Sequence, residues 1–173
     1  MMKKRLVRWL AFLAAAMFLF TGCGAKDFSM KEDMGIKVDG KWYPIFQDAA
    51  PLLSALGSDY ELFAAPSCLY DGEDKEFAYA GCSVFTNPGN GGIDVWYIIR
   101  LTDDSLETAR GIKVGDTKDA VVKAYGDKYY MESDYQMVYS ISGKQGDLAS
   151  PCMIIDFEND KVSCIEIYYP RNV

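Results

Sequence analysis

A short sequence occurs twice in the chain, and each copy is followed by the same order of patterns. The tetrapeptide Gly-Ile-Lys-Val at 35–38 recurs 76 residues later at 111–114. A helical pattern that ends in a glycine follows each copy, over 48–57 and over 117–126. Stretches with strand-like composition then follow in both halves. Self-similarity of this kind indicates that the chain repeats one supersecondary unit.

A second match supports the duplication and locates an insertion. Residues 97–106 align without gaps with residues 153–162, and an Ile-Ile pair, the next apolar positions and an aspartate coincide. The offset falls from 76 to 56, so the first copy contains 20 more residues than the second. The additional residues lie mainly in 42–46 and in a predicted loop at 61–74.

The predicted repeats cover 35–110 and 111–173, and each has a helix packed on one face of an antiparallel sheet. In the second repeat Asp116 is the expected N-cap of the helix, and the glycine after the helix suits a left-handed C-terminal cap. Asn159-Asp160 tolerates left-handed backbone and predicts a tight hairpin. The expected strands are 77–85, 93–101, 106–110, 135–142, 153–157 and 162–169, with a candidate short strand at 42–46. The predicted fold class is α+β, with three or four strands in each repeat.

The first 22 residues have the pattern of a secretory signal peptide. Basic residues at 3–8 precede an unbroken apolar run at 9–20. Such a run rises about 18 Å as a helix, whereas a bilayer core is about 30 Å thick. Residues 20–23, Phe-Thr-Gly-Cys, resemble the bacterial lipobox, in which the cysteine after the cleavage site receives a diacylglycerol. The resemblance implies a signal peptide at 1–22 and a lipid on Cys23, and an ordinary secretory signal is the alternative.

The chain after residue 22 is strongly acidic. Four of the 18 basic residues and none of the 25 acidic residues lie in 1–22, so the remainder carries a net charge of −11. Such a surface repels phosphate backbones, and we expect no nucleic-acid partner. The polar stretch within 23–34 indicates a tether between the lipid and the domain. The lipid on Cys23 would hold the protein on the extracytoplasmic face of the cell membrane.

The sequence contains no common catalytic motif. It has no histidine, which excludes Ser-His-Asp and Cys-His catalysis and the H-E-x-x-H zinc site. The adjacent Asp103 and Asp104 fall in a predicted turn, where an aspartate ordinarily binds its own backbone. The acidic loop at 71–76 lacks the EF-hand spacing and contains Lys75, so we expect no metal there. These features predict a protein that is not an enzyme and that holds no cofactor.

Four cysteines remain after the lipobox and could pair in an oxidising compartment. They are Cys68, Cys82, Cys152 and Cys164, and no C-x-x-C motif occurs. A two-residue turn at 159–160 places Cys152 out of register with Cys164, which disfavours a bridge between them. A bridge between Cys68 and Cys82 would close a short loop and is the favoured pairing. Four free thiols are the alternative.

One face of the predicted sheet mixes aromatic, basic and apolar side chains. At strand spacing, Leu101 and Phe157 belong to the rows that pack under the helices. The opposite face carries the candidate partner-binding residues, which are Trp96, Ile98, Arg100, Ile154 and Asp156. Tryptophan and arginine flanked by apolar residues are typical of interface cores. The alternatives are that the other repeat covers this face, or that it is a mixed, exposed sheet.

The second repeat resembles a known fold family. A glycine, a helix and a second glycine at 111–126, with a hairpin turn within 156–162, are similar to the repeat of the β-lactamase-inhibitor-protein-like fold. The small lipoprotein of the outer-membrane β-barrel assembly machine uses a similar single unit, and uncharacterised lipoproteins of Gram-positive bacteria also resemble it. The resemblance covers 35–173 and implies a protein-binding scaffold that has no catalytic residue.

Together these patterns predict a membrane-anchored extracytoplasmic lipoprotein that binds a protein partner without catalysis. Two other functions stay open at this point. An envelope assembly or structural lipoprotein would associate with integral envelope proteins. A hydrolase that uses carboxylates would need a deep acidic cleft.

Overall fold

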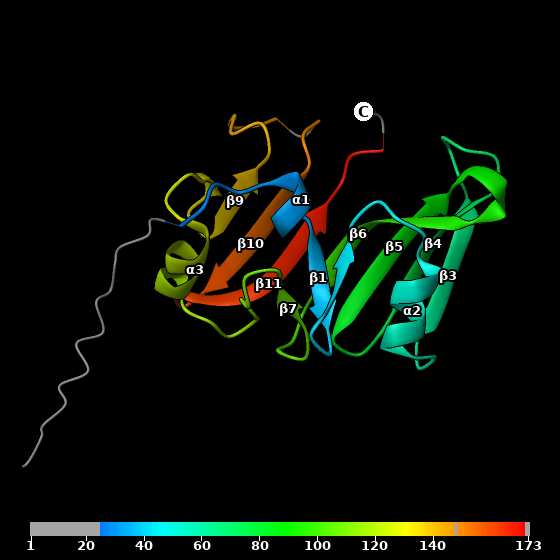
Figure 1. Ribbon diagram of the computed structural model, residues 1–173, viewed down its shortest axis with the longest axis horizontal. Helices are drawn as coiled ribbons and strands as arrows, with labels where there is room; N and C mark the ends of the chain where they lie inside the picture. Colours follow the sequence, from blue (N-terminus) through cyan, green and yellow to red (C-terminus); the bar gives the residue numbers. More distant parts are fainter. Residues whose placement is uncertain (1–24, 148, 172–173) are drawn as a thin grey trace, which may run out of the picture.

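The computed structural model describes residues 25–147 and 149–171, and it has an α+β fold (Figure 1). The predicted signal peptide at 1–22 and Cys23 lie outside the described residues. The helices are α1 (Met30–Asp33), α2 (Ala50–Leu56), the 3₁₀ helix η1 (Asn90–Gly92) and α3 (Lys118–Tyr125). The strands are β1 (Gly35–Val38), β2 (Lys41–Pro44), β3 (Glu61–Pro66), β4 (Glu73–Ala78), β5 (Cys82–Pro88), β6 (Asp94–Leu101), β7 (Glu107–Thr108), β8 (Tyr130–Ser133), β9 (Gln136–Ser140), β10 (Cys152–Glu158) and β11 (Lys161–Tyr168).

Eight strands of the described residues form one antiparallel sheet, in the order β3-β4-β5-β6-β11-β10-β9-β8. The final strands of the two halves of the chain meet at its centre, where Leu101 of β6 lies opposite Ile165 of β11. On its other side β11 pairs with β10, and Ile155 lies opposite Ile165. The sheet is therefore continuous across both expected repeats.

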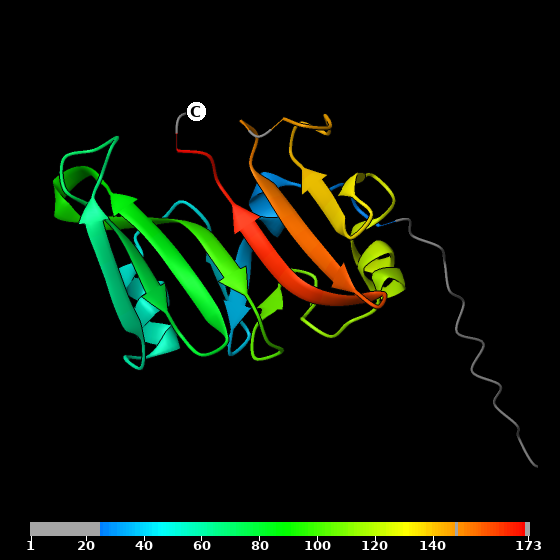
Figure 2. The ribbon, with the colours of Figure 1, turned by 180° about the vertical axis from the view of Figure 1, so that it is seen from behind.

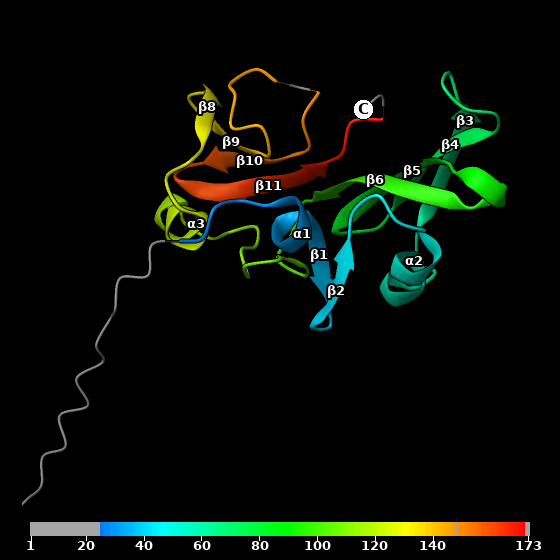
Figure 3. The same cartoon turned by 45° about the horizontal axis from the view of Figure 1, so that its top comes forward.

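A smaller sheet and the helices lie on one side of the large sheet. The smaller sheet has the order β2-β1-β7. In Figure 3 the β1–β2 hairpin and the helices α1, α2 and α3 all lie on the same side of the large sheet. Figure 2 shows the opposite side, where no helix or further strand of residues 25–147 and 149–171 covers the sheet. The large sheet thus has one covered face and one open face.

The hydrophobic core fills the space between these two layers. Alternate residues of the central strands point toward the helices, and Ile99, Ile155 and Ile165 are fully buried there. Leu52 of α2 and Val121 of α3 are fully buried in the same cluster. Burial of one such side chain contributes roughly 1.5–3 kcal/mol to stability. Since one cluster includes residues of both expected repeats, the two halves share their main source of stability.

Both helices predicted from the sequence are confirmed, and each ends at the expected glycine. Gly57 and Gly126 have φ angles of 91° and 85°, and their N–H groups donate to carbonyls four residues earlier. Glycine reaches such angles without steric cost. The predicted N-cap Asp116 is wrong, because the Thr117 hydroxyl accepts from the Ala120 N–H. The Asp116 carboxylate instead accepts from the Lys113 N–H in the preceding turn.

The predicted hairpin at 159–160 is also confirmed. Asn159 and Asp160 both have positive φ, 52° and 59°, as a two-residue type I′ turn requires. Phe157 lies opposite Val162, as the turn predicts. A β-bulge next to Phe157 then shifts the register by one residue, so that Asp156 rather than Ile155 lies opposite Cys164.

Several predicted strand boundaries are wrong. The single strand expected at 77–85 is two strands, β4 and β5, with a turn between them. The loop expected at 61–74 contains β3, and β8 was not predicted. Residues 106–110 contribute β7 to the smaller sheet, where it pairs with β1.

The two sequence matches do not mark structurally equivalent elements. Gly35 opens β1, where an added Cβ would collide with the Tyr43 carbonyl oxygen. Gly111 instead has a φ of 80° and lies in a turn, where its N–H donates to the Thr108 carbonyl over 3.0 Å. The gapless match aligns β6 with β10, although β6 adjoins β11 at the centre and β10 lies one strand further out.

The expected tether at 23–34 is wrong for the residues from Lys26 onward. This stretch contains α1, in which Asp33 is fully buried, and Met34 is fully buried after it. The Met34 carbonyl accepts from the Ile45 N–H over 2.9 Å. The stretch is therefore part of the folded domain. Among the described residues, no helix is both long and apolar enough to cross a membrane.

The predicted bridge between Cys68 and Cys82 is also wrong. Both are free thiols, and Cys68 is exposed whereas Cys82 is buried. Cys68 precedes β4 and Cys82 follows it, so the length of this six-residue strand separates them. That length is about 20 Å, whereas the Cα atoms of a disulfide are about 4.4–6.8 Å apart.

Candidate functional site

Four of the five predicted partner-binding residues lie together on the open face of the large sheet. Ile98 and Arg100 alternate along β6 with the buried Ile99, and Ile154 and Asp156 alternate along β10 with the buried Ile155. Strand β11 lies between them and brings them close. Glu166 of β11 is opposite both Arg100 and Ile154. Paired residues in antiparallel strands share a face, so the four side chains form one patch.

The fifth predicted residue, Trp96, is wrongly placed. It is 1% exposed and belongs to the core. A β-bulge between β5 and β6 is the reason, since Phe85 lies opposite Ile98 but Thr86 lies opposite Trp96. The residue skipped in this register is Tyr97, so Trp96 turns to the covered face. The backbone N–H of Trp96 donates to the Gln47 carbonyl over 3.1 Å.

An ion pair lies at the centre of the open face. The Arg100 Nε and Nη2 atoms donate to Glu166 Oε2 over 3.0 and 2.7 Å. The Arg100 guanidinium also lies 5.7 Å from the centre of the Phe85 ring. The hydrogen bond to Glu166 raises the pKa of Arg100, so this side chain stays charged. The Arg100 side chain is 49% exposed, so its guanidinium remains accessible to another molecule.

A hydrogen bond also holds the Asp156 side chain in place, on the part of the patch that β10 forms. Gln136 Nε2 of β9 donates to Asp156 Oδ1 over 2.8 Å. Cys164 lies opposite Asp156 across the bulge. Burial and the Asp156 carboxylate both raise the pKa of the Cys164 thiol, so it carries a proton at neutral pH. This thiol is therefore not activated as a nucleophile.

A shallow hollow extends the open face toward β3. Its volume is about 230 Å³, and its lining includes Phe63, Phe85 and Tyr97. The Arg171 guanidinium lies 4.7 Å from the centre of the Tyr97 ring, and Nη1 donates to Asp74 Oδ2 over 2.6 Å. Burial raises the pKa of the Tyr97 hydroxyl. The hollow therefore adds aromatic rings and an ion-paired arginine to the open face, beside the patch around Arg100.

Sequence reasoning missed part of this surface. Glu166 and Tyr168 alternate with the buried Ile165 and Ile167 along β11, which is a signal that the sequence contained. Tyr97 reaches the open face only through the bulge. The sequence predicts Asp74 in an acidic loop, but Asp74 lies in β4 and pairs with Arg171 near the other end of the chain.

The carboxylates considered for chemistry have local structural partners. Asp103 Oδ1 accepts from the Ser105 N–H over 2.9 Å and from the Ser105 hydroxyl. These hydrogen bonds lower the pKa of Asp103, as in an aspartate that closes its own turn. In the acidic loop and β4, Lys75 pairs with Asp94. Within 25–147 and 149–171, no group of three or more His, Cys, Asp or Glu residues is placed to hold a metal ion.

Comparisons with known proteins assign no family to this chain. No protein-family model and no curated protein matches it. One solved structure, that of the uncharacterized protein yfeY from Escherichia coli, aligns with 83% of this chain and 99% of its own length. The TM-score is 0.37 and the sequence identity is 15%. Similarity at this level assigns neither fold nor function.

Proposed function

We propose that this chain is a non-enzymatic protein-binding module that is held at the extracytoplasmic face of the membrane by a lipid on Cys23. The observation that carries the proposal is the open face of the large sheet. Its centre combines an exposed arginine with half-buried apolar side chains, among them Ile98 and Ile154. Because the helices cover only the other face of the sheet, these side chains are available to a partner.

The composition of this face supports a protein partner. Interface cores are enriched in aromatic residues and arginine, and hot spots gather where these side chains are well packed. Arg100 lies over Phe85 and is held by Glu166, so it loses little side-chain freedom when a partner binds. Tyr168, opposite Ile98, adds a ring with a polar end.

The topology supports an internal duplication with boundaries that differ from the sequence matches. Each of the helices α2 and α3 is followed by four strands of the large sheet. The second set of strands occurs in the reverse spatial order, and the two sets meet at β6 and β11. We infer that the repeated units are 50–101 and 118–168, with β1, β2 and β7 outside them. Such units would present one broad face formed by both copies.

Site-specific photo-crosslinking in intact cells tests the binding proposal. A photoreactive residue replaces Ile98 or Ile154 on the open face, and in the control it replaces Lys123, an exposed residue of α3 on the covered side. Crosslinks to the same protein from Ile98 and Ile154, but not from Lys123, would support the proposal. Equal crosslinking from all three positions, or crosslinking from Lys123 alone, would overturn it.

A further inference from the structure

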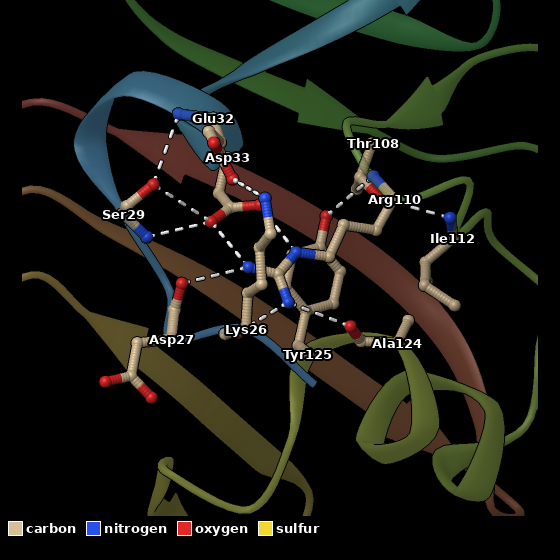
Figure 4. Close-up of polar contacts among 10 residues, drawn as sticks. All are labelled: Lys26, Asp27, Ser29, Glu32, Asp33, Thr108, Arg110, Ile112, Ala124 and Tyr125. Carbon is tan, nitrogen blue, oxygen red and sulfur yellow. Dashed lines mark hydrogen bonds and ion pairs between the residues drawn. The ribbon is translucent and has the colours of Figure 1, made fainter. Parts of the chain in front are cut away.

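The side chain of Arg110 holds the first described residues of the chain against the domain (Figure 4). Its Nη1 atom donates to the Lys26 carbonyl over 2.7 Å and to the Ala124 carbonyl over 3.0 Å. Its Nη2 atom donates to the Asp27 carbonyl over 3.0 Å. The guanidinium also lies 4.8 Å from the centre of the Tyr125 ring. One arginine thus joins the N-terminal segment to the C-terminal end of α3.

The remaining donors of Arg110 bind a buried carboxylate. Its Nε donates to Asp33 Oδ1 over 2.7 Å and its Nη2 to Asp33 Oδ2 over 2.8 Å. The Asp33 carboxylate is 1% exposed and also accepts from the Ser29 N–H over 2.8 Å. All five N–H donors of the guanidinium therefore have partners, which is the arrangement that arginine geometry favours.

Aromatic packing reinforces this attachment. The Phe28 ring lies 6.0 Å from the Tyr125 ring and 5.8 Å from the Tyr139 ring, measured between their centres. Ala25 lies against Gly126, where an added Cβ would be 3.3 Å from the Ala25 Cβ atom. The backbone is thus bound to the α3 end of the domain from its first described residues onward.

We propose that this attachment makes the domain stand directly on the bilayer, with the end that bears α3 facing the lipid and β3 pointing away. The proposal rests on the lipid anchor of the proposed function. Only Gly24 and Ala25 separate Cys23 from Lys26. Three peptide steps span at most about 11 Å, so an anchored Cys23 keeps the α3 end beside the headgroups.

The two ends of the molecule suit these positions. The exposed Lys128 pairs with Asp27 over 2.7 Å, and Lys26 pairs with Glu32 over 3.4 Å, so basic side chains offset acidic ones near the anchor. In Figure 1 the first described residues lie near α3 and β9, and β3 lies at the opposite end of the large sheet. Seven strand spacings separate β8 from β3, or about 34 Å. The large sheet then rises from the membrane with its open face reachable from the side.

Fluorescence quenching on vesicles tests this orientation. The lipidated protein is purified from the cells that produce it and placed in phosphatidylcholine–phosphatidylglycerol vesicles that contain a headgroup quencher. A single fluorophore is attached at Lys128→Cys or at Leu62→Cys in β3, in a background that carries Cys68→Ser and Cys164→Ser, since Cys68 is an exposed thiol and Cys164 is a partly exposed one. We expect the Lys128→Cys label to lose fluorescence and the Leu62→Cys label to keep it. Equal quenching at both positions would overturn the orientation.

A linker variant isolates the role of the short spacer. A flexible Gly-Ser segment inserted after Ala25 leaves Arg110 and its partners in place but lengthens the connection to Cys23. Loss of the difference in quenching supports the proposal, whereas an unchanged difference would mean that the spacer does not set the orientation and would overturn it. Failure of the lipid anchor itself gives a separate result, because the protein then does not bind the vesicles and the mass of its N-terminal peptide shows no lipid.

Discussion

Arg110 and Asp33 form a doubly hydrogen-bonded ion pair between residues that are 77 positions apart in the sequence. Asp33 ends α1, and Arg110 follows β7 just before the connection to α3. Arg110 also donates to the Ala124 carbonyl, so the pair joins the N-terminal segment, the end of the smaller sheet and α3 at one point. Because the Asp33 carboxylate is buried, removing either partner leaves the other poorly compensated.

The Asp33→Asn variant tests the energetic weight of this pair. An amide keeps the size of the side chain but removes the negative charge and one acceptor for Arg110. We expect the free energy of unfolding to fall by about 3 kcal/mol, measured from urea denaturation followed by fluorescence. Lys26→Ala, which removes only an exposed partner of Glu32, should leave it nearly unchanged. A variant Asp33→Asn as stable as the original protein would contradict the assignment.

Two neighbouring isoleucines test the distinction between the covered and open faces. Ile155 is fully buried on the covered face, whereas the adjacent Ile154 is half-buried on the open face. We expect Ile155→Ala to lower the free energy of unfolding by about 2–5 kcal/mol, as truncation in a packed core does. Ile154→Ala should cost clearly less in the same urea titration. The opposite order would mean that the faces of β10 are assigned the wrong way round.

The start of α3 provides a test of capping. The Thr117 hydroxyl accepts from the Ala120 N–H over 3.2 Å. Thr117→Ala should lower the free energy of unfolding by about 1 kcal/mol, since an N–H group of the first turn then loses its partner. Thr117→Ser retains the hydroxyl and is the matched control. If both variants have the same urea midpoint, the hydroxyl does not cap the helix.

Because two thiols are buried, we expect the free energy of unfolding to fall at alkaline pH. Burial raises the pKa of Cys152 from 9.0 to about 12 and that of Cys82 to about 11. The folded protein holds these protons more tightly than the unfolded chain does. The contribution is therefore fully present below pH 9 and is lost as the pH rises from 9 to 12. The Cys152→Ala variant should lose less stability over this range than the original protein. Parallel curves for the two proteins, from urea titrations across this range, would contradict the pKa shift.

Local sequence signals predicted the parts of the fold that depend on neighbouring residues. The glycines that end α2 and α3 and the turn at Asn159-Asp160 were predicted because their backbone angles favour a few residue types. Strands β3 and β8 were missed because their hydrogen-bond partners, rather than a clear alternation of their own residues, define them. They are the two edge strands of the large sheet.

The candidate site was predicted in part for a similar reason. Alternation along β6 and β10 placed Ile98, Arg100, Ile154 and Asp156 on one face, as the structure has them. The β-bulge between β5 and β6 turns Trp96 to the covered face, and no residue pattern in β6 marks that bulge. The Arg110–Asp33 pair could not be predicted either, because nothing in the sequence near Arg110 indicates a partner 77 residues away.

The claim that a partner binds the open face is tested most directly by combining Arg100→Glu with photo-crosslinking from position 154. Charge reversal places two acidic groups opposite each other at the centre of the patch, since Arg100 faces Glu166. The Arg100 side chain is 49% exposed, so we expect the variant to remain folded, as circular dichroism can check, while the crosslinked product is lost. A crosslinked product of undiminished yield from this folded variant would show that the partner does not bind at Arg100.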